Sequence, residues 1–162
     1  MNESVIIDAL RSPIGIKSGK LVGIRPDDLT AQVIKEMLIR NPNIDPSLIE
    51  DVILGCAFPE GPQGMLMAKG VSILAGIPET AGGAVINRFC GSSMDALHQI
   101  STKIESGDIE IGIASGVEDI LVAQRGNIIG MIREGANSYG QGFLEEVDTS
   151  IYTPSAGGVS RY

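Results

Sequence analysis

The chain has 162 residues, 43% of them hydrophobic, and a formal net charge of −8 at pH 7. This suits one folded domain with a largely aliphatic core, and the acidic balance argues against a nucleic-acid-binding protein. No apolar run reaches the roughly 20 residues of a membrane helix. The N-terminus lacks a signal-peptide pattern, so we expect a cytoplasmic protein. Two cysteines and one histidine form neither a disulfide framework nor a zinc motif, so no metal is expected.

Short apolar runs alternate with helical patterns along the first 118 residues. Four strands are predicted, at residues 5–7, 52–57, 83–89 and 109–117. Three helices are predicted between them, at residues 26–40, 63–75 and 92–106. This order predicts an α/β fold: a mostly parallel sheet of βαβ units with helices on both faces. After Glu118 glycines are frequent and no hydrophobic period persists, so 1–118 is the predicted core and 119–162 an excursion from it.

The apolar positions of the predicted helices indicate which faces turn inward. In helix 26–40 one face carries Leu29, Val33, Ile34, Met37 and Leu38. In helix 92–106 the face predicted to point inward carries Met94, Leu97, Ile100 and Ile104.

Cys90 is the main candidate for a functional residue. It lies between strand 83–89 and helix 92–106, at the sheet edge where ligands of α/β proteins collect. Unpaired N–H groups at a helix N-terminus favour a thiolate over a thiol, and the thiolate is the nucleophilic form. The backbone N–H groups of Cys90 and Gly91 are candidate donors to an oxyanion. The alternative from the local context is that Cys90 is an ordinary core cysteine.

Other residues give weaker signals. His98, the only histidine, lies eight residues along the same helix, roughly 12 Å from Cys90, so it is predicted to be a packing or surface residue. A self-contained cysteine hydrolase is therefore not expected. Residues 61–64 match no phosphate-binding pattern and read as a plain turn. Cys56 is predicted to be a core residue. Glu118 and Asp119 are either solvated carboxylates at a strand end or functional groups.

Residues 87–94, Asn-Arg-Phe-Cys-Gly-Ser-Ser-Met, resemble the nucleophile motif of thiolases, the acetyl-CoA acyltransferases. Three more segments occur in the family's order: the start at residues 5–15, Leu-Ala-Gly-Ile-Pro at 74–78 and Ala-Ser-Gly-Val-Glu at 114–118. Within this motif, residues 91–94, Gly-Ser-Ser-Met, are most similar to the corresponding residues in the β-subunits of bacterial fatty-acid oxidation complexes. Ser115 and residues 119–120 depart from the family pattern, and neither departure touches the nucleophile.

The resemblance implies a thiolase-like N-terminal half, with residues 119–162 as the start of a loop domain. It implies that Cys90 attacks the keto carbon of a 3-ketoacyl-CoA, that acetyl-CoA leaves, and that free coenzyme A collects the acyl group. The reverse path joins two acetyl-CoA molecules. Coenzyme A is then a substrate, and no cofactor is implied. The implied partners are acyl-CoA, coenzyme A, further copies in a homodimer or homotetramer, and a fatty-acid oxidation α-subunit.

A thiolase is more than twice as long as this chain and contains two such halves. The second half carries a Gly-His-Pro histidine that activates the nucleophile, an Asn- or His-Glu-Ala segment that positions an oxyanion water, and an acid/base cysteine in Cys-x-Gly. This sequence contains none of these motifs. We therefore expect the N-terminal part of a 3-ketoacyl-CoA thiolase, inactive alone. Two alternatives stay open: a ketoacyl or hydroxymethylglutaryl synthase, and a non-catalytic remnant acting as a folded or interacting module.

Overall fold

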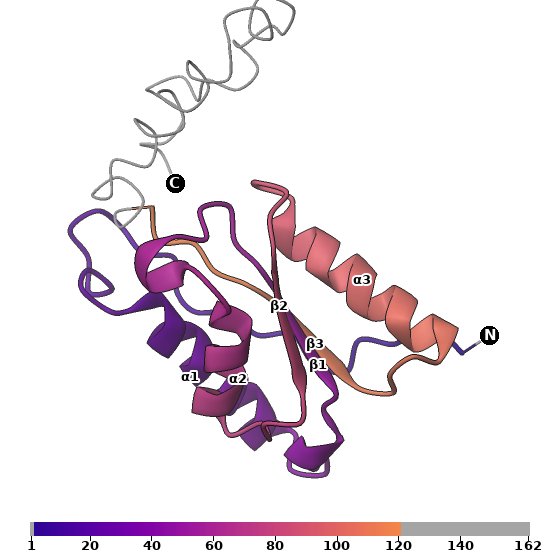
Figure 1. Cartoon of the computed structure of the whole chain (residues 1–162). Coiled ribbons are helices and arrows are strands. Elements are labelled where there is room, and N and C mark those ends of the chain that lie inside the picture. Colours follow the sequence, from indigo (N-terminus) through magenta and orange to yellow (C-terminus); the bar gives the residue numbers. More distant parts are fainter. Residues whose placement is uncertain (1, 121–162) are drawn as a thin grey trace, which may run out of the picture.

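The computed structural model describes residues 2–120 (Figure 1). Of the predicted start of a loop domain at 119–162, residues 121–162 therefore lie outside the described part of the chain. The described elements are, in chain order, α1 (Pro26–Arg40), the short 3-10 helix η1 (Pro46–Leu48), β1 (Asp51–Gly55), the 3-10 helix η2 (Gly61–Gln63), α2 (Met67–Ala75), β2 (Gly82–Ile86), α3 (Ser92–Ser106) and β3 (Gly112–Gly116). No helix within this part of the chain is both long and apolar enough to span a bilayer.

The three strands form one parallel sheet in the order β2-β1-β3. Ile53 at the centre of β1 is in register with Ala84 of β2 and Ala114 of β3. Each crossover contains a helix: α2 joins β1 to β2, and α3 joins β2 to β3. Figure 1 shows α1 and α2 on one face of the sheet and α3 on the other. The predicted parallel sheet of βαβ units with helices on both faces is confirmed.

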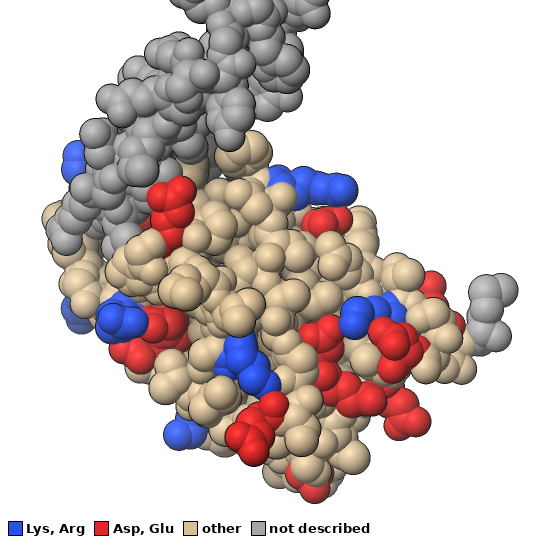
Figure 2. Space-filling view, in the orientation of Figure 1, with Lys and Arg blue, Asp and Glu red and all other residues tan. Residues whose placement is uncertain are grey.

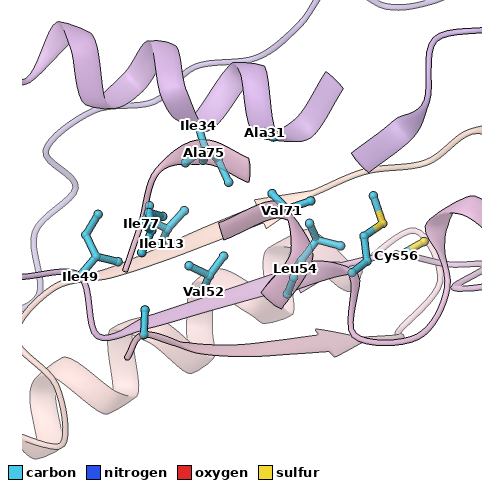
Figure 3. Packing of buried hydrophobic residues seen from close by; sticks show 13 residues of the cluster. Ala31, Ile34, Ile49, Val52, Leu54, Cys56, Val71, Ala75, Ile77 and Ile113 are labelled. Carbon is cyan, nitrogen blue, oxygen red and sulfur yellow. The ribbon is translucent and has the colours of Figure 1, made fainter. Parts of the chain in front are cut away.

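The core lies on both sides of β1, whose five residues are all buried. Val52 and Leu54 point toward α1 and α2, where they pack with Ile34 and Val71 in the larger cluster (Figure 3). Ile53 belongs to the smaller cluster beneath α3. Alternate residues of the central strand therefore enter opposite cores, as expected for a strand covered on both faces.

Helix boundaries follow local signals closely. Pro26 opens α1, and the left-handed Gly107, with φ of 79°, ends α3, so the bounds predicted for these two helices are confirmed. The helix predicted from residue 63 instead begins at Met67. The separate 3-10 turn η2 and the extended Gly64 interrupt the chain before it.

The buried strand predicted at residues 5–7 is wrong, because Val5, Ile6 and Ile7 are 70%, 71% and 63% exposed. The segment is anchored at its ends by side chains. Ser4 Oγ lies 2.7 Å from Ser101 Oγ on α3, and Asp8 accepts a hydrogen bond of 2.8 Å from Asn41 Nδ2 after α1. Branched apolar residues favour an extended chain, but a strand also needs a paired neighbour, and no described strand pairs with this segment.

The inward face predicted for α3 is only partly correct. Ile100 is buried, whereas Met94 and Leu97 are 59% and 36% exposed. The contact with the sheet follows Ala96, Ile100 and Ile104, which are spaced four residues apart along the helix. At about 100° per residue, Leu97 lies at the margin of this stripe and Met94 lies about 120° from its centre, so neither side chain is buried against the sheet.

Candidate active site

Cys90 lies in the turn between Ile86, the last residue of β2, and Ser92, the first residue of α3. Its side chain is exposed, so the alternative of a core cysteine does not describe it. The turn stands at the carboxyl edge of the parallel sheet, the location predicted from the sequence. The thiol is therefore open to a ligand beside the N-terminus of a 15-residue helix.

Two glycines bring the start of α3 against the sheet. A Cβ atom on Gly55 would lie 2.4 Å from both the Ser92 carbonyl carbon and the Ser93 nitrogen. A Cβ atom on Gly116 would lie 2.6 Å from Ser93 Cβ. Since real Cβ atoms do not approach so closely, glycine at the ends of β1 and β3 allows the helix N-terminus to rest directly on the strand ends. This packing fixes the height of Cys90 above the sheet.

The turn before Cys90 contains an unfavourable backbone conformation at Phe89, whose φ is +47°. A bulky residue in the left-handed region is strained by about 1–2 kcal/mol. Hydrogen bonds hold it there: the Phe89 N–H donates to Asn87 Oδ1 at 2.9 Å, and the hydroxyl of the buried Ser92 donates to the Phe89 carbonyl at 2.6 Å. The same Ser92 oxygen accepts from the Arg88 N–H at 2.8 Å.

The two backbone donors predicted for an oxyanion differ in their surroundings. The N–H of Gly91 donates to the Arg88 carbonyl at 3.0 Å. The N–H of Cys90 has no acceptor among residues 2–120. An oxyanion beside the thiol would therefore find the Cys90 N–H open, whereas Gly91 would have to share its proton with Arg88.

Glu118 and Gln63 form a polar network that the sequence did not reveal. Glu118 accepts hydrogen bonds from the Ala57 N–H and from Gln63 Nε2, both at 2.7 Å. Gln63 is fully buried; its Nε2 also donates to the Phe58 carbonyl at 2.9 Å, and its Oε1 accepts from the Asp119 N–H at 2.8 Å. Residues 61–64 form a turn, as predicted, and this turn also carries the Gln63 amide that links the ends of β1 and β3.

Asn87 connects this network to the cysteine turn. Its Nδ2 donates to the Ala57 carbonyl at 2.9 Å, while its Oδ1 accepts from Phe89. From the sequence alone, Asn87 is identified only as part of the motif at residues 87–94. The signal that indicates its local role is the tendency of Asn to accept a hydrogen bond from the backbone two residues later. Its bond to Ala57 could not be predicted without the fold.

Cys56 is a core residue, as predicted, and is 1% exposed. Burial, reinforced by the nearby Glu118 carboxylate, raises the pKa of the Cys56 thiol to about 12. The thiol is therefore protonated at neutral pH and unsuited to nucleophilic attack.

His98 lies on the exposed side of α3, which confirms that it is a surface residue. Neither His98 nor any group of three or more His, Cys, Asp or Glu side chains forms a potential metal site within residues 2–120. The described part of the site thus supplies an exposed thiol and a backbone donor beside a helix N-terminus, and no histidine base.

Comparisons with known proteins agree with this arrangement. The family model described as "Thiolase, N-terminal domain" matches residues 4–149. A 3-ketoacyl-CoA thiolase of Shewanella denitrificans is 49% identical over 119 residues, covering 73% of this chain and 31% of the relative. A β-ketoadipyl-CoA thiolase of Escherichia coli is 45% identical over 120 residues, covering 74% of this chain and 30% of the relative.

A solved structure gives the same result. The crystal structure of the Bacillus anthracis acetyl-CoA acetyltransferase superposes with a TM-score of 0.67 at 33% sequence identity, covering 72% of this chain and 29% of that protein. The chain thus spans less than a third of the length of these curated relatives. Sequence, family model and fold agree, and the chain belongs to the thiolase family, whose N-terminal domain it matches.

Proposed function

We propose that this chain is the N-terminal part of a 3-ketoacyl-CoA thiolase and that Cys90 is its nucleophile. The observation that carries the proposal is the exposed Cys90 thiol at the N-terminus of α3. It occurs in a chain 49% identical to a 3-ketoacyl-CoA thiolase over 119 residues. The names of the relatives support a 3-ketoacyl-CoA or acetyl-CoA substrate class.

The proposed reaction transfers an acyl group in two steps. The Cys90 thiolate attacks the keto carbon, and the oxygen of that carbon takes negative charge beside the Cys90 N–H, with the Gly91 N–H as the second proposed donor. The bond between the keto carbon and its neighbour then breaks, the departing carbanion takes up a proton, and acetyl-CoA leaves. The thiolate of coenzyme A attacks the acyl-cysteine and releases Cys90. By the family resemblance, the groups that move these protons belong to the second half of a thiolase.

The wider organisation is part of the same proposal. Residues 1–118 would be the N-terminal α/β core and 119–162 the start of the loop domain. β2 lies at an edge of the described sheet, with β1 on one side only, which supports pairing with a second copy in a homodimer or homotetramer. A fatty-acid oxidation α-subunit as partner and a cytoplasmic location stay predictions from the sequence.

The alternatives are less well supported. A ketoacyl or hydroxymethylglutaryl synthase would also place a cysteine between strand and helix, but the relatives described above are thiolases or an acetyl-CoA acetyltransferase. A non-catalytic module would gain nothing from an exposed thiol with an open N–H donor beside it.

A chimera tests the proposal directly. Residues 1–118 of this chain replace the matching segment of the Shewanella denitrificans thiolase, and thiolysis of acetoacetyl-CoA is followed through the enolate absorbance. We expect activity in the chimera, a loss of at least about a thousandfold in Cys90→Ser, and retained activity in the matched control Cys56→Ala. A folded chimera without activity, or one that keeps its activity in Cys90→Ser, would overturn the proposal.

A further inference from the structure

We infer that Asn87 is a positioning residue for Cys90. Its side chain holds Phe89 in the left-handed conformation that presents the thiol at the N-terminus of α3, and Glu118 supports Asn87 by fixing the backbone of Ala57. This inference rests on the proposed role of Cys90 as nucleophile.

The first step of the argument is the geometry at Phe89. With φ of +47°, Phe89 needs a stabilising contact to keep a backbone conformation that residues other than glycine avoid. Asn87 Oδ1 accepts the Phe89 N–H at 2.9 Å, which closes the turn from the side of β2. Cys90 follows directly, so a rotation at Phe89 would move the thiol away from the helix N-terminus.

The second step is what holds Asn87 itself. Its Nδ2 donates to the Ala57 carbonyl at 2.9 Å, and the N–H of Ala57 donates to the Glu118 carboxylate at 2.7 Å. These two groups belong to adjacent peptide units, so the two hydrogen bonds hold the backbone of Ala57 on both sides of its Cα atom and keep its carbonyl within reach of Asn87. The chain of contacts runs from the end of β3, across the end of β1, to the turn after β2.

A third contact connects the same two loops. The rings of Phe58 and Phe89 lie with centroids 6.3 Å apart at an interplanar angle of 64°, an edge-to-face pair. Asn87 is exposed and adds nothing to either core cluster. Its contacts therefore serve the conformation of the turn that carries the thiol, not the burial of apolar surface.

The test is the rate at which iodoacetamide alkylates each cysteine of the full chain at pH 7, read by mass spectrometry. Cys56 is an internal reporter of folding, because it is labelled only if its buried site opens. We expect Asn87→Ala to slow labelling of Cys90 by about two- to tenfold, the effect of losing one or two ordinary hydrogen bonds, while Cys56 stays unlabelled.

Asn41→Ala is the matched control. It removes comparable side-chain bonds, to Asp8 and to the Met37 carbonyl, at the opposite end of the sheet, and should leave Cys90 labelling unchanged. If Cys56 becomes labelled in Asn87→Ala, the milder variant Asn87→Ser is measured instead. Its hydroxyl can still accept the Phe89 N–H, so a smaller loss is expected.

A rescue experiment separates positioning from a general structural effect. Phe89→Asn introduces a residue that tolerates positive φ. In that background Asn87→Ala should therefore lower the alkylation rate of Cys90 much less than it does in the wild type. Unchanged or faster Cys90 labelling in Asn87→Ala, or equal effects in both backgrounds, would overturn the inference. Slow labelling of Cys90 in the wild-type chain would instead count against the proposed nucleophile, so the two failures are distinguishable.

Discussion

The Glu118 carboxylate accepts a hydrogen bond of 2.7 Å from the backbone N–H of Ala57, a residue 61 positions earlier in the chain. This contact joins the segments that leave β3 and β1 at the carboxyl edge of the sheet. The Ala57 carbonyl also accepts a hydrogen bond from Asn87, in the turn that follows β2. The three loops around Cys90 therefore form one hydrogen-bonded unit.

Cys90 should react with iodoacetamide at least about tenfold faster than Cys56 in the folded chain at pH 7. Cys90 is exposed beside a helix N-terminus, whereas the Cys56 thiol is buried and its pKa is raised to about 12. Brief alkylation followed by mass spectrometry measures both rates. Labelling of Cys56 should stay slow at neutral pH, because its thiol is both protonated and buried. Equal labelling near pH 7 would contradict the assignment.

The chain of 162 residues should not turn over by itself. It contains neither a Gly-His-Pro nor a Cys-x-Gly motif. In acyl-transfer enzymes the loss of one oxyanion donor lowers the catalytic rate by about a hundred- to a thousandfold. A chain without the base and the second cysteine should therefore retain little activity. Thiolysis of acetoacetyl-CoA by purified chain should remain at background. A rate within about tenfold of a full-length thiolase measured in parallel would show that another group acts as base.

Gly55→Ala should destabilise the fold by about 1–3 kcal/mol, because its Cβ would lie 2.4 Å from the backbone of Ser92 and Ser93. Urea unfolding measures the change. Gly70→Ala is the matched control: Gly70 lies within α2, and its Cβ would meet no atom within 4 Å. That substitution should stabilise the chain by about 0.5–1 kcal/mol. Equal effects at the two positions would refute the close approach of α3 to β1.

The outer edge of β2 should mediate self-association. The Ile86 carbonyl accepts from the Cys56 N–H and so faces β1. Backbone groups alternate in direction along a strand, so the N–H of Val85 points to the open edge. Val85→Pro should weaken a dimer or larger oligomer in sedimentation experiments, and Val85→Thr, which keeps the N–H, should not. A wild-type chain that stays monomeric at high micromolar concentration would contradict this prediction.

The sequence by itself determined much of the secondary structure and the position of the thiol. Pro26 and Gly107 marked helix ends that the structure confirms, because these residues act on the backbone locally. The alternation of apolar runs and helices predicted the parallel sheet. The placement of Cys90 between a strand and a helix followed from the same local patterns.

Tertiary structure decided what depends on neighbours distant in the chain. The apolar residues 5–7 remain exposed because no described strand pairs with them, and Met94 and Leu97 are exposed because α3 contacts the sheet through Ala96, Ile100 and Ile104. The roles of Gln63, Asn87 and Glu118 arise only where the ends of the strands meet. Local patterns report how a segment prefers to fold, whereas hydrogen bonds between loops exist only after the sheet has brought those loops together.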